Sequence, residues 1–144
     1  MKNLSIAALA IFFAISLSAQ TVQYNSNKGI AIKGYDPVAY FIEHKAVEGN
    51  KQFSTEWSGS QWKFISQANL DSFKLTPEKY APQFGGYCAM GVSENHKAPT
   101  DPTAWTIVND KLYLNYNASV KEMWLKDTVN RINTANTNWQ SLNK

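Results

Sequence analysis

Residues 53–65 read FSTEWSGSQWKFI and carry the clearest secondary-structure pattern in the chain. Two short runs rich in aromatic residues, 53–57 and 61–65, flank the triplet Ser58-Gly59-Ser60. Aromatic residues favour strands, and glycine supplies the positive φ that a tight hairpin turn requires. This segment therefore predicts a β-hairpin.

A second hairpin is predicted nearer the carboxyl end. Residues 105–108 and 112–115 are two more apolar runs, and Asn109-Asp110-Lys111 between them favour a turn. We expect the two hairpins to form one small antiparallel sheet.

Helix signals surround the hairpins. Asp36-Pro37 combines an acceptor for free backbone N–H groups with a residue that has no N–H, which predicts a short helix ending near His44. A further helix is predicted to begin at Asn69 or Asp71, and Thr76-Pro77 repeats the first signal.

The carboxy-terminal segment predicts a long amphipathic helix. Ser119 and Glu122 fit a capping box, and apolar residues then recur at three- and four-residue steps as far as Leu142. A break is expected near residues 133–138. The predicted fold class is therefore α+β, with a small antiparallel sheet built from two hairpins, short helices and a long carboxy-terminal helix.

The amino-terminal residues predict export. Lys2 precedes an apolar run at residues 4–17, and the small residues Ser18 and Ala19 follow it, as in a cleavable secretory signal peptide. The run is shorter than the roughly 20 residues that a membrane-spanning helix needs. We expect cleavage after Ala19.

Three segments follow from this pattern: a signal peptide at 1–19, an extended lead-in at 20–33, and one domain at 34–144. No cysteine immediately follows the apolar run, so a lipid-anchored cysteine is not expected and cleavage would leave no stable membrane anchor. Frequent Asn, Lys and Ile suggest a bacterial source. The expected destination is then the periplasm or the exterior, and the sequence leaves the oligomeric state open.

Composition argues against several functional classes. The formal net charge is only +3, and no run or stripe of Lys and Arg occurs, so nucleic-acid binding is not predicted. The sequence has no Gly-rich phosphate loop, no His-x-x-x-His pair and no Gly-x-Ser-x-Gly elbow, so it points to no enzyme class and we lean against catalysis. The five Trp residues are expected in the core, with a stacking platform for sugars or bases as the alternative.

The best candidate for chemistry is the only cysteine, Cys88, in the loop-rich segment 82–102. Functional residues gather on loops that a rigid scaffold positions. Gly85-Gly86 precede Cys88 and Gly91 follows it, so backbone N–H groups can approach the sulfur and favour the thiolate. A buried, inert thiol is the competing interpretation.

The first hypothesis is a soft-metal site. Cys88 and Met90, with either His96 or His44, would supply thiolate, thioether and imidazole ligands. Ligands of this kind select Cu(I) or another thiophilic ion.

Two further hypotheses stay open. Cys88 could exchange between thiol and oxidised states, and it would then need an external thiol or a redox partner protein because the chain has no second cysteine. Alternatively, the domain is a non-catalytic binding or structural module.

Several unusual segments occur in an order that resembles the YHS-domain family, in particular its exported bacterial subgroup. The resemblance extends over residues 29–142. Its segments are GYDPVAYF at 34–41, SGSQWKFIS at 58–66, LDSFKLTPEKYAPQFGGYCAMGVS at 70–93, DPTAWTIVNDKLYLNYN at 101–117, and Asn138-Trp139.

This resemblance implies a small α+β unit of antiparallel strands with helices, similar to metallochaperone-type domains that hold soft metals by cysteine. In some exported relatives the position that matches Cys88 is a selenocysteine, which implies a reactive atom there. The metal-binding branches place two or three cysteines in the site, and this sequence departs from them because only Cys88 remains.

Overall fold

A computed structural model describes residues 22–144 of the chain. The predicted signal peptide, residues 1–19, lies outside the described residues. The described chain contains both strands and helices, which confirms the α+β class. Within residues 22–144, no helix has the length and apolar character needed to span a membrane.

The first sheet has four strands in the order β1-β2-β4-β3. The predicted hairpin at residues 53–65 is confirmed as β3 and β4, which pair antiparallel. The lead-in supplies β1 and β2, and β2 pairs parallel with β4 through Ile30 and Gln61. The strands are β1 (Ser26–Asn27), β2 (Ile30–Ala31), β3 (Asn50–Trp57) and β4 (Ser60–Phe64).

The second predicted hairpin forms a sheet of its own. Its strands are β5 (Asp101–Val108) and β6 (Lys111–Asn115), which pair antiparallel. The expectation of one antiparallel sheet built from both hairpins therefore does not hold. The hairpins belong to separate sheets, and the larger sheet is mixed because the lead-in adds a parallel neighbour to β4.

Both hairpin turns have the backbone that the right-handed twist of paired strands favours. Ser58 and Gly59 have φ of 48° and 75°, and Asn109 and Asp110 have φ of 49° and 59°. Two successive left-handed residues match the type I′ turn, in which Gly, Asn and Asp are preferred.

Short helices connect and cover these strands. The predicted helix after Asp36-Pro37 is α1, and α3 begins at Pro77 as predicted. The helix expected to start at Asn69 or Asp71 starts earlier, because the Ser66 side chain accepts the Asn69 N–H and caps it. These elements are η1 (Ile32–Gly34), α1 (Ala39–Ile42), α2 (Gln67–Leu75), α3 (Pro77–Tyr80), η2 (Gln83–Gly86) and α4 (Ala89–Ser93).

The carboxy-terminal segment forms two helices, α5 (Ala118–Leu125) and α6 (Thr128–Leu142). The prediction of a single long helix is therefore wrong. The break lies at Asp127 rather than within 133–138, because the backbone of Asp127 is not helical, with φ of −149°. The cap of α5 is also not the predicted Ser119, since the Asn117 side chain accepts the Val120 N–H at 2.9 Å.

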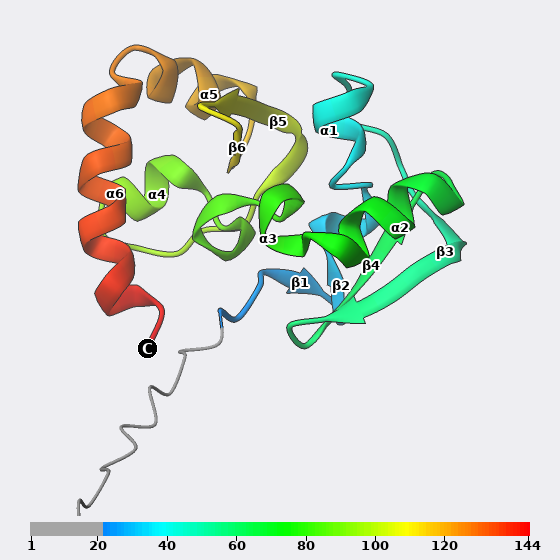
Figure 1. Cartoon of the computed structure of the whole chain (residues 1–144). Coiled ribbons are helices and arrows are strands. Elements are labelled where there is room, and N and C mark those ends of the chain that lie inside the picture. Colours follow the sequence, from blue (N-terminus) through cyan, green and yellow to red (C-terminus); the bar gives the residue numbers. More distant parts are fainter. Residues whose placement is uncertain (1–21) are drawn as a thin grey trace, which may run out of the picture.

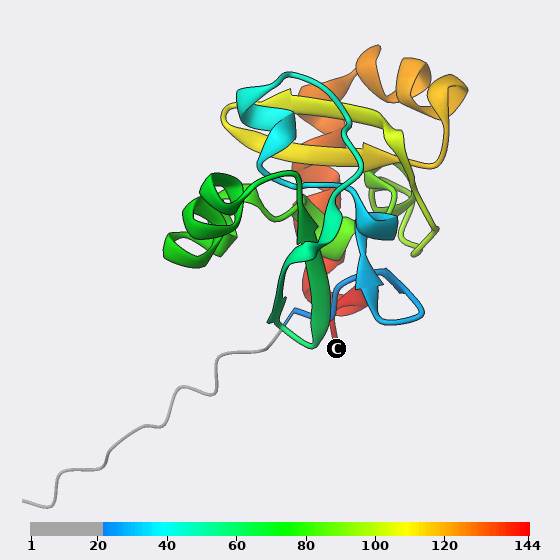
Figure 2. The ribbon, with the colours of Figure 1, turned by 90° about the vertical axis from the view of Figure 1, so that its right-hand side faces the viewer.

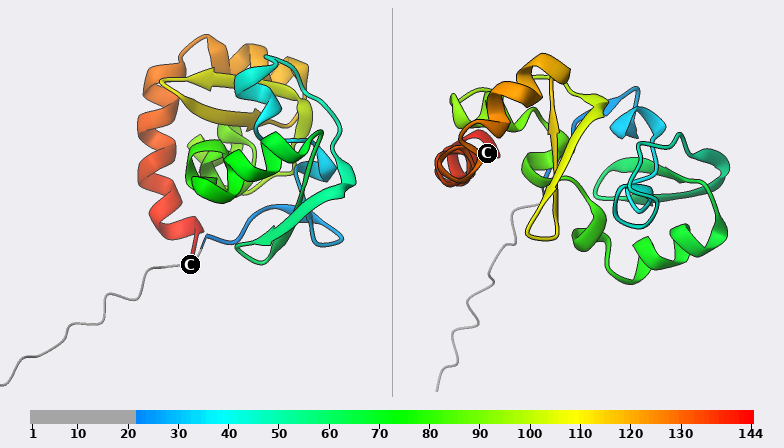
Figure 3. Two further views of the ribbon diagram at one scale, coloured as in Figure 1. Left: turned by 45° about the vertical axis from the view of Figure 1, so that its right-hand side comes forward. Right: turned by 90° about the horizontal axis from the view of Figure 1, so that it is seen from above.

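The interior consists of two hydrophobic cores on either side of the β5–β6 hairpin. Figures 1 and 3 show this hairpin between α6 on one side and the β3–β4 hairpin on the other. The buried residues of the first core are Ala31, Ile32, Val38, Tyr40, Trp62, Phe64, Leu70, Phe73, Tyr80, Ala81, Leu112 and Leu114. Those of the second core are Phe84, Cys88, Ala89, Met90, Val92, Tyr113, Trp124 and Ala135.

Strand β6 is the wall that the two cores share. Leu112 and Leu114 face the first core, whereas Tyr113 faces the second. Alternate residues of a strand point to opposite faces, so Asn115 lies on the same face as Tyr113. This alternation is what brings an amide side chain to the second core, where Cys88 lies.

All five Trp residues belong to the two cores, as the sequence predicted. Trp62 and Trp124 are buried, and the other three pack against one core or the other. The alternative of a stacking platform finds no support in this packing.

The beginning of the described chain joins the two halves of the molecule. The Ser58 hydroxyl donates to the Val22 carbonyl at 2.9 Å, and the Asn25 N–H donates to the Gly85 carbonyl at 2.7 Å. Tyr24 packs between these contacts, with its ring 5.2 Å from that of Trp57. Figure 2 shows that both ends of the described chain lie near the tip of the β3–β4 hairpin.

Candidate functional site

Cys88 follows a tight turn that leads from η2 into α4. Gly85 and Gly86 both have a left-handed backbone, with φ of 61° and 75°. A Cβ atom at Gly85 would lie 2.8 Å from the Gln23 carbonyl oxygen, so the close approach of the two chains also requires glycine. The Cys88 N–H donates to the Ala98 carbonyl at 3.0 Å, which fixes the residue at the start of α4.

The sulfur atom of Cys88 is buried but has polar partners. Cys88 is only 2% exposed. Its Sγ accepts the Gly91 N–H at 3.5 Å as the cap of α4, and its S–H donates to Asn115 Oδ1 at 3.6 Å. The sulfur is therefore not enclosed by hydrocarbon alone, although it lies in a hydrophobic core.

Asn115 places an unpaired donor beside this thiol. Its side chain is fully buried, its Oδ1 also accepts the Met90 N–H at 3.1 Å, and its Nδ2 has no hydrogen-bond partner. Since the two end atoms of an amide are about 2.3 Å apart, Nδ2 lies within about 6 Å of Sγ. A buried N–H left unpaired costs about 1–3 kcal/mol, so an acceptor placed beside Nδ2 would be stabilised.

A cavity of about 320 Å³ opens beside Cys88, and we call it the sulfur pocket. Cys88, Met90 and Met123 all line it, and they are the only sulfur-containing residues among residues 22–144. All the sulfur of the described chain therefore meets at one cavity. The full lining is Cys88, Met90, Gly91, Glu94, His96, Ala98, Tyr116, Val120 and Met123.

His96 brings an imidazole to the same pocket. Its Nδ1 lies 3.4 Å from the Glu94 carbonyl oxygen, and a Cβ at Gly91 would lie 3.2 Å from its Nε2. When Nδ1 donates to that carbonyl, the lone pair of the neutral ring is on Nε2. Nε2 then faces Gly91, whose N–H donates to Cys88 Sγ. A carbonyl that orients the ring in this way is typical of ligating histidines.

The pocket has little uncompensated charge. Glu94 is the one carboxylate in its lining, and its Oε1 lies 3.4 Å from Nη1 of Arg131 on α6. A lining of sulfur, imidazole and apolar groups suits a soft, singly charged ion better than a hard divalent one.

The structure does not bring His44 to the sulfur pocket. His44 follows α1 with φ of 52° and is exposed, and it does not belong to the lining. In the described part of the chain, no three His, Cys, Asp or Glu residues gather in a way that could hold a metal ion. A metal ligand set here would need the methionine sulfur atoms.

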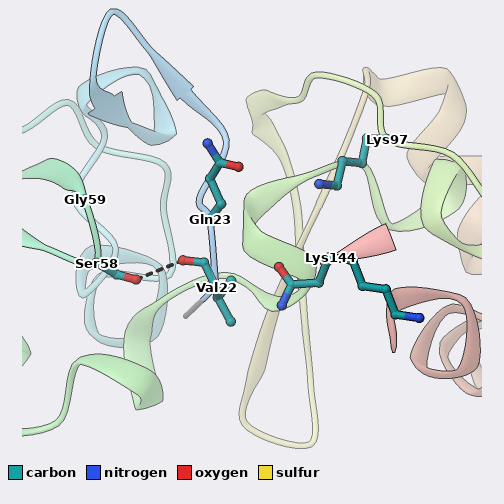
Figure 4. Close-up of a pocket in the computed structure, with 7 residues that line it drawn as sticks. Val22, Gln23, Ser58, Gly59, Lys97 and Lys144 are labelled. Carbon is teal, nitrogen blue, oxygen red and sulfur yellow. Dashed lines mark hydrogen bonds between the residues drawn. The ribbon is translucent and has the colours of Figure 1, made fainter. Parts of the chain in front are cut away.

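A larger cavity, of about 510 Å³, lies where the two ends of the described chain meet (Figure 4). It is separate from the sulfur pocket. Val22 and Lys144 line it, and Lys97 reaches it while its Nζ lies 5.0 Å from the centre of the Tyr87 ring. This cavity has surface lysines but no sulfur or histidine, so its lining does not suit a soft metal ion.

Sequence reasoning missed two residues of the sulfur pocket and its surroundings. Asn115 could have been found from the alternation of β6, since it shares a face with the buried Tyr113. Met123 could not, because its position depends on how α5 packs against α4 and no spacing in the sequence links it to Cys88.

Comparison with known proteins gives one match. Residues 38–84 match the model of the YHS domain family. The matched segment runs from just before α1 into η2 and ends before Cys88. No curated protein and no solved structure matches the chain.

Proposed function

We propose, from the match of residues 38–84 to the model of the YHS domain family, that the protein binds a soft metal ion, Cu(I) in the first instance, in the sulfur pocket. The family is associated with metal binding, which supports a metal-related role in broad terms. The proposed resident ligands are Cys88, Met90 and His96.

The observation that carries the proposal is the gathering of soft donors. Cys88 and Met90 at the start of α4, together with Met123 on α5, bring every sulfur atom of residues 22–144 to one cavity. Hydrophobic packing alone gives no reason for the thiol, both thioethers and an imidazole to share it. Thiolate and thioether ligands select Cu(I) among the common metal ions.

Each of these side chains would have a distinct role. Cys88 supplies the anionic ligand, and it must first lose the proton that it donates to Asn115 Oδ1. The Gly91 N–H, which already points at Sγ, would stay as a donor to the thiolate. Met90 adds a buried thioether, and His96 offers Nε2 from the rim.

The proposed setting is outside the cytoplasm, in the periplasm or beyond. This follows from the amino-terminal pattern at residues 1–19. A chain with one cysteine cannot form an internal disulfide there, so its thiol stays available to a metal ion or to a partner that delivers or receives one.

The test is an anaerobic titration of the purified protein with Cu(I) against a coloured competing chelator. We expect Cys88→Ser and His96→Asn each to weaken binding by roughly tenfold or more. His44→Asn is the matched control, because His44 does not line the pocket and asparagine tolerates its left-handed backbone. An affinity that Cys88→Ser leaves unchanged would exclude this function.

Thiol oxidation at Cys88 is the second candidate, and the unpaired Nδ2 of Asn115 favours it. In this reaction the thiolate sulfur attacks one oxygen of a hydroperoxide, the O–O bond breaks, and an alcohol or water leaves. The sulfur becomes a sulfenic acid, whose oxygen could accept the Asn115 N–H. An external thiol would then form a mixed disulfide with release of water, and a second would restore the cysteine.

This candidate has its own measurement. Peroxide treatment followed by a sulfenic-acid trap should label the wild-type protein and not Cys88→Ser. A thiol that reacts with an alkylating agent yet gives no trapped product after peroxide would eliminate the redox function. A purely passive module fits the structure less well, because Cys88 has polar partners and lines a cavity.

A further inference from the structure

The soft donors of the sulfur pocket lie at different depths. Cys88 and Met90 are 2% and 5% exposed, whereas Met123 is 49% exposed. His96 is also exposed. The pocket therefore has a buried thiol and a buried thioether at its base and a thioether at its mouth.

We propose that Met123 is the entry ligand of this pocket: the first sulfur atom to contact an arriving Cu(I) ion, and the one that passes the ion inward to Cys88. The inference rests on the metal-binding function proposed above. It assigns Met123 to the rate of transfer, and Cys88 and Met90 to the final affinity.

The position of Met123 on α5 supports this role. Val120 and Met123 are three residues apart and share one face of the helix, and both line the pocket. Tyr116, just before the helix, lines the same mouth and is 52% exposed. Met123 is therefore held on a fixed helix face, but its sulfur still reaches solvent.

The chemistry of the thioether supports the same order of events. Methionine has a flexible, unbranched side chain, and its neutral sulfur needs no deprotonation before it binds a metal ion. A thiolate is an anion and binds a soft cation more strongly than a neutral thioether does. The ion therefore has a favourable path from the exposed Met123 to the buried Cys88.

Burial of Cys88 makes such an intermediate ligand necessary. A thiol that is 2% exposed cannot meet a protein or chelator that still holds the ion. Ligand exchange requires an incoming donor to bind before the outgoing one leaves, and Met123 is the sulfur atom that a bound carrier can reach.

The experiment measures the rate at which the protein withdraws Cu(I) from its coloured bicinchoninate complex, together with the final affinity. Met123→Leu keeps the size of the side chain and removes the sulfur. We expect transfer to slow by roughly tenfold, while the affinity changes by less than about threefold. Cys88→Ser should instead lower the affinity.

A double variant, Met123→Leu with Leu125→Met, is the matched control. Leu125 lies on the same helix, is 41% exposed and does not line the pocket, so the double variant keeps the number of exposed thioethers but moves one away. We expect it to stay as slow as Met123→Leu. A rate restored by the displaced sulfur would overturn the proposal.

The outcomes separate the two proposals. If Cys88→Ser loses binding and Met123→Leu transfers at the wild-type rate, the entry role fails and the metal site stands. If Met123→Leu lowers the affinity without slowing transfer, Met123 is a resident ligand and the entry role also fails. If Cys88→Ser binds as wild type does, both proposals fail.

Discussion

Asp36 joins three segments of the first core through its carboxylate, and Asp36→Asn tests how much that junction contributes to stability. The side chain is fully buried. Its Oδ1 accepts the N–H groups of Val38 and Ala39 at 2.8 and 3.2 Å, at the start of α1. Its Oδ2 accepts the Ile65 N–H at 2.9 Å and the Asn69 Nδ2 at 2.8 Å. All four partners are donors.

An asparagine at this position has one oxygen and one NH₂ group. If its oxygen keeps the two donors of α1, its NH₂ group faces Ile65 N–H and Asn69 Nδ2, and both lose their acceptor. Each buried unpaired donor costs about 1–3 kcal/mol, which gives a loss of about 2–6 kcal/mol. The side chain of Asn69 can turn to offer its own oxygen, so we expect a value near 3 kcal/mol.

The assay is reversible thermal and urea unfolding followed by tryptophan fluorescence. For a chain of this size, 3 kcal/mol corresponds to a fall in Tm of about 10 °C. Asp101→Asn is the matched control: Asp101 also precedes a proline, but its Oδ1 accepts only from Thr103, and an amide oxygen can still do so. If both variants lose the same stability, the Asp36 carboxylate does not hold these segments together.

Three more outcomes follow from the described contacts. Burial, and to a lesser extent the charge of Glu78, raises the pKa of Tyr24 to about 12. The stability that the neutral phenol contributes is therefore complete below pH 10 and is lost between pH 10 and 12. Tyr24→Phe should reduce the fall in the free energy of unfolding over this range, measured by urea unfolding at a series of pH values. Gly85→Ala should lower Tm by several degrees, because the new Cβ meets a backbone carbonyl at 2.8 Å in a left-handed residue, and a Tm equal to wild type would contradict that close approach. Gly91→Ala should displace the His96 ring, whose Nε2 would lie 3.2 Å from the added methyl group, and a Cu(I) affinity unchanged by this variant would argue against His96 as a ligand.

The elements with strong local signals were predictable from sequence. Ser58-Gly59 and Asn109-Asp110 form the turns that their residue types favour, and the flanking runs are strands. The class of the fold follows from these local patterns. The pairing of β2 with β4 does not, because it depends on a single register pair, Ile30 with Gln61, between segments with no shared periodicity.

The ends of helices were harder to predict than their existence. Ser119 and Glu122 match a capping box, yet Asn117 is the cap, since its side chain reaches the Val120 N–H. Competing caps two residues apart differ by too little free energy for a pattern to decide between them. Asp127 breaks the long helix although the apolar repeat continues through it.

Three of the residues that the sequence nominated, Cys88, Met90 and His96, line one cavity. The glycines around Cys88 correctly marked a turn that fixes the sulfur. No sequence pattern indicated Met123, because its contact with the cavity arises from packing between helices. The burial of the thiol likewise depends on the whole second core.

Both faces of β6 are buried, one in each core, and this limits where the chain can be cut into fragments that still fold. Leu112 and Leu114 complete the first core, yet they lie well beyond residue 84, where the match to the YHS domain ends. Ala31 and Ile32, which precede the matched segment, belong to the same core. A fragment excised at the family boundaries would lack both contributions and expose the surfaces they cover. We therefore expect the segment that matches the YHS domain model not to fold alone, and grafting it into another protein would require a substitute for β6.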